Sequence, residues 1–296
     1  MDLGVGSVVF SMGTVALLSK AARNHSDLTI SSRMMRSLRH SLPLTLLGVG
    51  RLAFVKTAEY QEHVSEYGVH WNFFITLACL PIFVAILQSL LTPFTTSVIS
   101  FNTRWRQAVL PFALALMLMY EFALQQLGLQ EWILQAPRTN FWNANKEGLC
   151  SMFGYVAILL CGMYASAWII RSNPTTSTVL KHARQEAHQY MLAVIVSWSI
   201  YLVVSQVLHW QVSRRMANTA YVSLVVALNM SCLAAFRLVY ANVSSAMSDT
   251  VDIRNTEKSN DAMPELYATI FESVNYNSLL TFLLVCVSMF SLTRRL

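Results

Sequence analysis

Apolar runs separated by short polar segments repeat along the chain, and they predict helices that cross a membrane. One crossing needs about 20 apolar residues. On this basis we count eight candidate spans, at approximately 3–19, 41–55, 72–91, 107–127, 151–170, 187–208, 219–240 and 278–292. Segment 241–276 is the one long polar linker. We therefore expect an all-α, polytopic transmembrane helix bundle that forms a single domain, with 241–276 as a cytosolic linker.

Composition supports this class and argues against two others. Hydrophobic residues make up 55% of the chain and charged residues 12%, as is typical of polytopic membrane proteins. The net charge of +6 is spread over interhelical loops, so we expect no nucleic-acid binding. The five cysteines are scattered without a C-x-x-C pair, which predicts packing residues and neither disulfides nor a zinc site.

Loop charges predict the orientation of the bundle. Loops 20–40, 92–106, 171–186 and 241–276 fall on one side and carry 12 Lys and Arg residues. Loops 56–71, 128–150 and 209–216 fall on the other side with the C-terminal tail, and these carry 7. Because cytoplasmic loops are enriched in Lys and Arg, the first group is expected in the cytosol. The second group then faces the opposite compartment, which is the lumen for an endoplasmic reticulum protein.

The most charged stretch is 51–74, RLAFVKTAEYQEHVSEYGVHWNFF. If its loop is helical, Glu59, His63, Glu66 and His70 share one face, although Gly68 can end the helix before His70. Two carboxylates and two imidazoles beside a membrane suit proton transfer. No H-E-x-x-H motif is present, so we expect no metal site. The alternative is an interfacial amphipathic helix whose polar face is only hydrated.

Two further polar clusters follow. In 140–155, NFWNANKEGLCSMFGY, residues Asn143, Asn145, Lys146 and Glu147 precede a span that is expected to begin near Ser151. They can hold a phosphate or a thioester oxygen, or they can cap an ordinary helix.

In 211–221, QVSRRMANTAY, Arg214 and Arg215 lie on the predicted non-cytosolic side against the charge rule. They suit a lipid phosphate, or they are snorkelling anchors. Inside the predicted spans, Arg51, Glu121 and Arg237 are the costly charged residues. Arg51 can snorkel to the same surface as Lys56, and a structural ion pair within the bundle is the expected role of such residues.

These clusters carry a resemblance to a known family. The matching stretches are MDLGVGSVVFSMG, RLAFVKTAEYQEHVSEYGVHWNFFITL, FWNANKEGLCSMFGY and VSRRMANTAY, and they occur in the family's order up to about Tyr221. The chain resembles the inositol acyltransferases of glycosylphosphatidylinositol (GPI) anchor synthesis, the fungal Gwt and mammalian PIG-W type. The resemblance implies a multi-pass endoplasmic reticulum enzyme with luminal motif loops. It also implies transfer of a fatty acyl group, typically palmitoyl, from acyl-CoA to the inositol of glucosaminyl-phosphatidylinositol.

The resemblance also implies that the chain is the C-terminal part of a fold of about thirteen spans. The family carries an aspartate and a lysine believed essential for catalysis just ahead of MDLGVG, and this sequence has no matching residues. Among the residues present, we predict that His70, His63 and Glu59 handle protons. The predicted ligands of substrate phosphate or thioester groups are Arg51, Lys56, Gln61, Glu66, Asn72, Asn143, Asn145, Lys146, Arg214 and Arg215. We expect acyl-CoA as co-substrate and no further cofactor.

Two rival functions are a membrane transporter and an inactive fragment of the acyltransferase. A transporter is favoured by inverted repeats or by paired spans broken by Gly or Pro, and the sequence shows neither.

Overall fold

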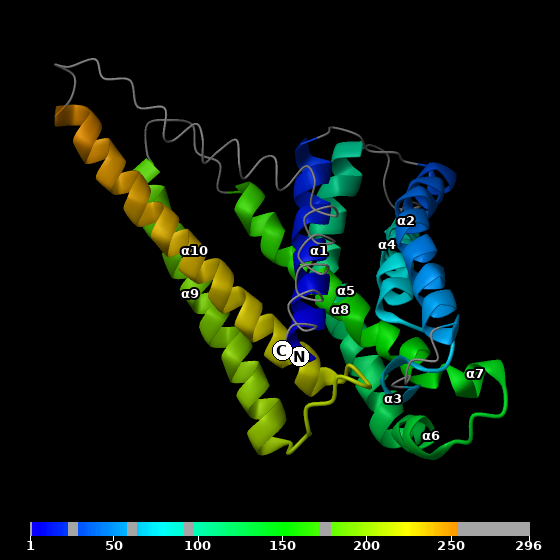
Figure 1. Cartoon of the computed structure of the whole chain (residues 1–296). Helices are drawn as coiled ribbons and strands as arrows, with labels where there is room; N and C mark the ends of the chain where they lie inside the picture. Colours follow the sequence, from blue (N-terminus) through cyan, green and yellow to red (C-terminus); the bar gives the residue numbers. More distant parts are fainter. Residues whose placement is uncertain (1, 23–28, 58–63, 92–97, 172–178, 254–296) are drawn as a thin grey trace, which may run out of the picture. The chain divides into compact units, whose positions relative to one another are not determined.

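The structure is a computed structural model that describes residues 2–22, 29–57, 64–91, 98–171 and 179–253 (Figure 1). All regular elements in these ranges are helical, which confirms the predicted all-α class. The helices are α1 (Asp2–Ala22), α2 (Ile30–Thr57), α3 (Val64–Tyr67), α4 (Phe73–Leu91), α5 (Val98–Gln126), α6 (Leu129–Gln135), α7 (Phe141–Ala144), α8 (Lys146–Arg171), α9 (Val179–Leu202), the π-helical turn η2 (Val203–Val207) and α10 (Thr219–Ile253). The chain divides into two compact units, Met1–Asn242 and Val243–Leu296. The arrangement below is that of the first unit.

Five helical segments within the described residues are long and apolar enough to cross a membrane. They are Phe73–Leu91, Arg104–Gln126, Lys146–Ser166, His188–Val207 and Thr219–Phe236, and a shorter apolar helix covers Leu3–Ala16. The predicted span 41–55 lies within α2, whereas 278–292 is outside the described residues. A polytopic helical bundle is confirmed, and the division into eight spans with a cytosolic linker stays a prediction.

Several helices extend beyond the predicted span boundaries, among them α8 and α10. Helix α8 begins at Lys146, ahead of the predicted start near Ser151, so part of the second polar cluster lies in its first turn. Helix α10 continues to Ile253, beyond the predicted end of its span at Tyr240.

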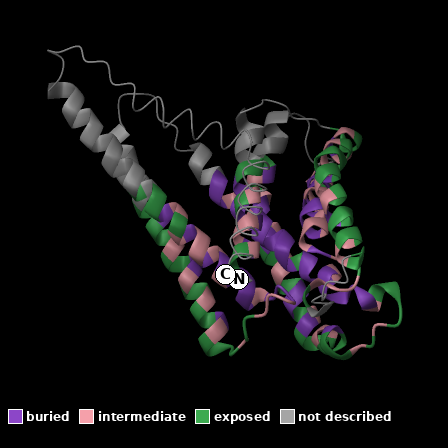
Figure 2. Ribbon diagram, viewed as in Figure 1, coloured by how far each residue is buried: buried purple, intermediate pink, exposed green. Residues whose placement is uncertain are grey.

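Helix α8 is the central element of the first unit. In its membrane-length segment, 78% of the residues are buried, against 17% in that of α9. Figure 2 shows the same contrast, with buried residues concentrated along α8. The buried core gathers residues of α8 with others from α1, α4, α5 and α10, among them Phe10, Leu80, Trp105, Tyr155 and Tyr221. A helix that is apolar on all sides is expected at such a position.

Small residues allow α1 and α8 to approach closely. A Cβ atom added to Gly13 would lie 2.1 Å from the carbonyl oxygen of Leu159, and one added to Gly162 would lie 2.2 Å from that of Phe10. Both distances are far below van der Waals contact with backbone atoms that cannot move aside. Glycine at these two positions is therefore required for the α1–α8 contact, as is common where helices pack within membranes.

Helices α2 and α4 are joined by polar groups as well as by apolar contacts. The Ser41 hydroxyl of α2 donates a hydrogen bond to the carbonyl of Ala78 in α4 at 2.5 Å. Nearer the start of α4, Asn72 donates to the carbonyl of Gly48 at 2.8 Å. Such side-chain partners stabilise backbone groups that water cannot reach.

The cysteines of the described residues carry free thiols, and they range from buried Cys150 to exposed Cys232. They are Cys79, Cys150, Cys161 and Cys232, and Cys286 lies outside the described residues.

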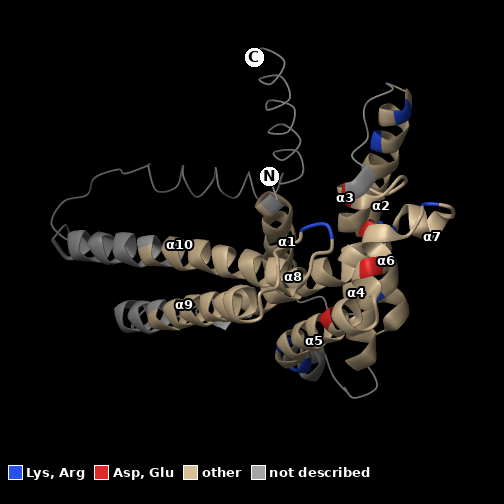
Figure 3. Cartoon of the chain, turned by 90° about the horizontal axis from the view of Figure 1, so that it is seen from below, with Lys and Arg blue, Asp and Glu red and all other residues tan. Residues whose placement is uncertain are grey.

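Described residues of the three polar clusters lie at one end of the unit. This end contains α3, α6, α7, the first turn of α8 and the loop that precedes α10 (Figures 1 and 3). We call residues 64–72, 128–149 and 208–219 the polar end. The prediction that these loops share one side therefore holds for their described residues. Which compartment they face stays a prediction.

Candidate functional site

The first cluster does not form one continuous helical face. Helix α3 spans only Val64–Tyr67, and Gly68 follows with φ +117°, so His70 lies beyond the helix that carries Glu66. The expected break at Gly68 is thus confirmed, and the expectation that Glu66 and His70 share a helical face is wrong. Glu59, Gln61 and His63 lie outside the described residues.

Gly68 allows the first cluster to lie against the second. A Cβ atom at this position would lie 2.7 Å from both the carbonyl oxygen of Ala144 and the Cα of Asn145. The backbone N–H of the next residue, Val69, donates to that same Ala144 carbonyl at 3.0 Å. Only glycine meets the dihedral angle and the available space together.

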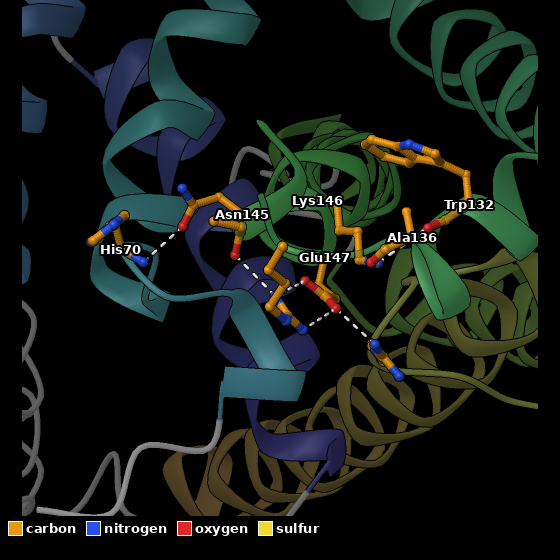
Figure 4. Close-up of polar contacts among 9 residues, drawn as sticks. His70, Trp132, Ala136, Asn145, Lys146 and Glu147 are labelled. Atoms are coloured by element: carbon orange, nitrogen blue, oxygen red, sulfur yellow. Dashed lines mark hydrogen bonds and ion pairs between the residues drawn. The ribbon is translucent and has the colours of Figure 1, made fainter. Parts of the chain in front are cut away.

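His70 is held by its backbone and leaves its imidazole exposed (Figure 4). Its N–H donates to Oδ1 of Asn145 at 2.7 Å. Its ring nitrogen Nδ1 lies 3.4 Å from Nζ of Lys56, at the end of α2. The ring also stacks on Phe141, with centroids 6.3 Å apart and planes 7° apart. The predicted proton-handling residue therefore lies at the surface of the polar end, beside a cation.

Asn145 and Lys146 are buried and make their hydrogen bonds within the protein. Nδ2 of Asn145 donates to the carbonyl of Phe141 at 2.9 Å. Nζ of Lys146 donates to the carbonyls of Trp132 at 3.2 Å and Ala136 at 2.5 Å, where α6 ends. An ammonium group there interacts favourably with the carbonyls at the C-terminal end of a helix. That they bind substrate stays a prediction.

Glu147 is the common acceptor of two arginines. Its side chain is fully buried. Arg138 donates to both carboxylate oxygens, at 3.0 and 2.6 Å, and Arg215 donates to Oε1 at 2.7 Å. Arg138 also donates to the Ala144 carbonyl at 3.0 Å, the same acceptor that holds Val69. A bidentate arginine–carboxylate pair fixes both groups in space, so Glu147 joins the second and third clusters.

Arg214, the neighbour of Arg215, forms an ion pair with a different carboxylate, that of Glu66. Its Nη2 lies 2.8 Å from Oε1 of Glu66, and its guanidinium carbon lies 5.5 Å from the ring centroid of Tyr67. Burial lowers the pKa of Arg214, but the hydrogen bond with Glu66 and the nearby Tyr67 outweigh this and raise it. Burial also raises the pKa of the Tyr67 hydroxyl, although the charge of Arg214 opposes this effect. The guanidinium therefore stays charged, and it lies over a neutral ring.

The loop that carries both arginines is anchored to the bundle. Asn218 accepts hydrogen bonds from the N–H groups of Ser213 and Tyr221 at 3.1 and 3.2 Å, which closes the loop and caps α10. Tyr120 of α5 donates to the carbonyl of Met216 at 2.6 Å. The arginines thus project from a fixed segment.

Glu121 caps the start of α10, whereas an ion pair was predicted for it. It is buried, and Oε2 accepts the N–H of Thr219 at 3.0 Å, in the first turn of α10. Its other oxygen accepts from the Gln125 side chain at 2.9 Å. A carboxylate is favourable at the positive end of a helix dipole. Among the described contacts, Glu121 is therefore a helix-capping residue. Arg51 is exposed, and the side chain of Arg237 lies outside the description.

The other predicted ligands differ in accessibility. Asn72 is buried, and its Oδ1 accepts the N–H of Ile75 at 3.1 Å, which caps α4. Asn143 is partly exposed in α7, where its backbone N–H is capped by Asn140 at 2.8 Å. The described residues contain no group of three or more His, Cys, Asp or Glu side chains that could hold a metal ion.

Two residues of the site were missed by the sequence analysis. Arg138 lies in a loop outside the motif cluster, and its link to Glu147 depends on the turn between α6 and α7. Tyr67 lies inside the first cluster but was not among the predicted site residues. Its separation from Arg214 by 147 positions leaves no local signal of their contact.

The polar end carries groups of the kinds that anion binding and proton transfer require. The Lys56–His70 pair and the Glu66–Arg214 pair lie there, near a network in which Arg138 and Arg215 share the buried carboxylate of Glu147. Cations suit phosphate groups, and an imidazole suits a hydroxyl proton.

Comparison with known proteins identifies the family. The model of the GWT1 family matches residues 1–288. GPI-anchored wall transfer protein 1 of Gibberella zeae is 36% identical over 301 residues, which cover 96% of this chain and 56% of that protein. The proteins of the same name from Yarrowia lipolytica and Saccharomyces cerevisiae are 34% and 33% identical, over 96% and 97% of this chain and 55% and 58% of their own length. The chain thus spans a little over half the length of the curated relatives it matches. Its similarity to them extends through all three polar clusters, and the chain belongs to the GWT1 family.

Proposed function

We propose that this chain acts in GPI-anchor biosynthesis, as part of a membrane-bound acyltransferase of the endoplasmic reticulum. Family membership and the names of the relatives support the pathway. The membrane-length helices support a multi-pass protein. The relatives are longer than this chain, so the activity belongs to the whole enzyme.

The proposed reaction moves a fatty acyl group, palmitoyl by family resemblance, from acyl-CoA to an inositol hydroxyl of glucosaminyl-phosphatidylinositol. The hydroxyl oxygen attacks the thioester carbonyl, and a base takes the hydroxyl proton. The new C–O bond forms as the C–S bond breaks, and coenzyme A leaves as a thiol after it takes up a proton. Donors near the carbonyl oxygen stabilise its developing charge.

One observation carries the proposal: three clusters far apart in sequence converge at one end of an apolar bundle. A lipid substrate presents its headgroup at such an end while its acyl chains remain among the helices. His70 is exposed there and is fixed through its backbone, which suits a group that exchanges protons with a headgroup hydroxyl.

The predicted site residues take two kinds of role in this proposal. His70 handles protons, together with His63 and Glu59. Arg51, Lys56 and Asn143 offer accessible polar groups to the substrate. Gln61, which lies outside the described residues, stays a predicted ligand. Asn72, Asn145 and Lys146 are buried and hydrogen-bonded internally, so we assign them to holding the site in shape.

The test measures inositol-acylated glucosaminyl-phosphatidylinositol by mass spectrometry, in membranes of cells that lack the enzyme. The chain is expressed alone and fused to the N-terminal part of the Gibberella zeae relative. We expect product only from the fusion. In the fusion, His70→Ala and His70→Gln should each lower turnover at saturating acyl-CoA by about 100-fold.

His188 provides the matched control, because it is exposed on α9, away from the polar end. His188→Gln should leave turnover unchanged. An active His70→Gln enzyme would rule out proton transfer by His70, because glutamine hydrogen-bonds but takes up no proton near neutral pH. Absence of product from the fusion, with protein present, would exclude the acyltransferase function.

A further inference from the structure

Two neighbouring arginines at the polar end are bound to carboxylates of very different accessibility. The carboxylate partner of Arg215, Glu147, has a side chain with 0% exposure, whereas that of Arg214, Glu66, has one that is 46% exposed. Glu147 also accepts two hydrogen bonds from Arg138. Glu66 belongs to a helix of only four residues. The two ion pairs therefore differ in how easily they separate.

We propose that Arg214 exchanges Glu66 for a phosphate group of the substrate, while Arg215 remains bound to Glu147. The proposal rests on the proposed function for the identity of the ligand as a phosphate-bearing substrate. It assigns Glu66 as a counter-ion that the substrate displaces, which differs from its predicted role as a substrate ligand.

The surroundings of Arg214 favour this exchange. Its side chain is only 15% exposed, and it is supported from one side by the ring of Tyr67. The Tyr67 hydroxyl lies 3.4 Å from Nη1. These contacts hold the guanidinium in place when Glu66 leaves. An arginine fork binds a phosphate as readily as a carboxylate, because both present paired oxygens.

Separating the Arg215 pair would be far more costly. Loss of Arg215 from Glu147 leaves a buried carboxylate with one cation fewer, and an incompletely paired buried charge is strongly unfavourable. A partly exposed pair such as Glu66–Arg214 contributes much less. A phosphate at the polar end therefore competes with Glu66 and not with Glu147.

The experiment measures binding of two phosphate-bearing probes to the purified full chain in lipid nanodiscs. Coenzyme A and dioctanoyl phosphatidylinositol are titrated separately, so that the two arms distinguish a nucleotide phosphate from a lipid phosphate. Glu66→Gln should lower the Kd for one probe by about threefold to fivefold, the scale of a partly exposed ion pair. Arg214→Gln should raise that Kd by at least about tenfold.

The double variant and the controls isolate the exchange. In the double variant Arg214→Gln with Glu66→Gln, the loss of Glu66 should no longer lower the Kd relative to Arg214→Gln alone. Glu131→Gln removes the same charge from an exposed residue of α6 at the polar end and should leave both Kd values unchanged. Arg215→Gln should lower the unfolding temperature, because its charge is committed to the buried carboxylate of Glu147.

Tighter binding upon loss of a polar contact is a result that a purely structural role for Glu66 does not produce. If Glu66→Gln lowers the Kd of neither probe, the exchange is excluded. It is also excluded if Glu66→Gln still lowers the Kd in the background of Arg214→Gln. Should Glu66→Gln fold poorly, Glu66→Asp provides the same test with a smaller expected gain, because its shorter side chain weakens the ion pair. The titrations measure binding without turnover, so their outcome is independent of the acyl-transfer assay.

Discussion

The backbone N–H of His70 lies 2.7 Å from Oδ1 of Asn145, across 75 positions of sequence. Asn145 directly precedes α8, the central helix of the first unit. His70 of the first cluster is therefore held by the second cluster through a backbone contact that does not involve the imidazole ring. The two motifs act as one structural unit.

Gly68 is predicted to be indispensable for this contact. Gly68→Ala places a Cβ atom against the backbone of residues 144 and 145 at a φ angle that alanine adopts at a cost, so we expect a loss of about 2–3 kcal/mol in unfolding free energy. Gly50→Ala is the matched control, because a Cβ atom there meets nothing within 4 Å. It should leave stability unchanged or raise it by up to about 1 kcal/mol. Chemical denaturation in nanodiscs measures both, and equal effects would contradict the prediction.

Glu147→Gln is predicted to loosen the polar end. The change keeps the size of the side chain but leaves Arg138 and Arg215 without their shared anion, which should cost about 3 kcal/mol of unfolding free energy. Glu131→Gln, an exposed change on α6, should stay within about 0.5 kcal/mol of the wild type. Amide hydrogen exchange should also rise at residues 68–70, because Arg138 holds the Ala144 carbonyl to which Val69 donates. Unchanged exchange there would show that Glu147 does not support the first cluster.

Alkaline pH is predicted to destabilise the protein through Tyr67. Burial raises the pKa of this hydroxyl above its ordinary value of 10.0, so the folded state keeps a proton that the unfolded chain releases. The resulting stability is fully present below pH 10.0 and is lost as the pH rises through the raised pKa. Between pH 10.0 and the raised pKa, the unfolding temperature of the wild type should therefore fall more steeply than that of Tyr67→Phe. Equal slopes would contradict burial of this hydroxyl.

Cysteine labelling in intact microsomes tests the predicted topology. A cysteine at Thr139 and another at Gln211, both exposed at the polar end, should react with an impermeant reagent only after the membrane is opened. A cysteine at Ser31, exposed near the start of α2, should react without opening, because its loop is predicted to be cytosolic. Labelling of all three from one side would exclude this orientation.

Much of the architecture follows from local sequence. Apolar runs of about 20 residues predict spans because the bilayer core excludes unpaired backbone groups, and α4, α8 and α10 contain three of the predicted spans. Gly68 also predicts the end of α3, because glycine readily adopts positive φ. The motif stretches predicted the GWT1 family, which the comparisons confirm.

The pairing of charges was decided by the tertiary structure alone. Arg214 and Arg215 are adjacent in sequence, yet one contacts Glu66 and the other Glu147. Glu121 caps α10 where an ion pair was predicted. Periodicity places a side chain on a helical face, but it does not say which distant helix end lies opposite. A buried charge needs a partner, because burying it unpaired is costly. Which partner is within reach is determined only by the packing of α3, α5, α8 and the loop before α10.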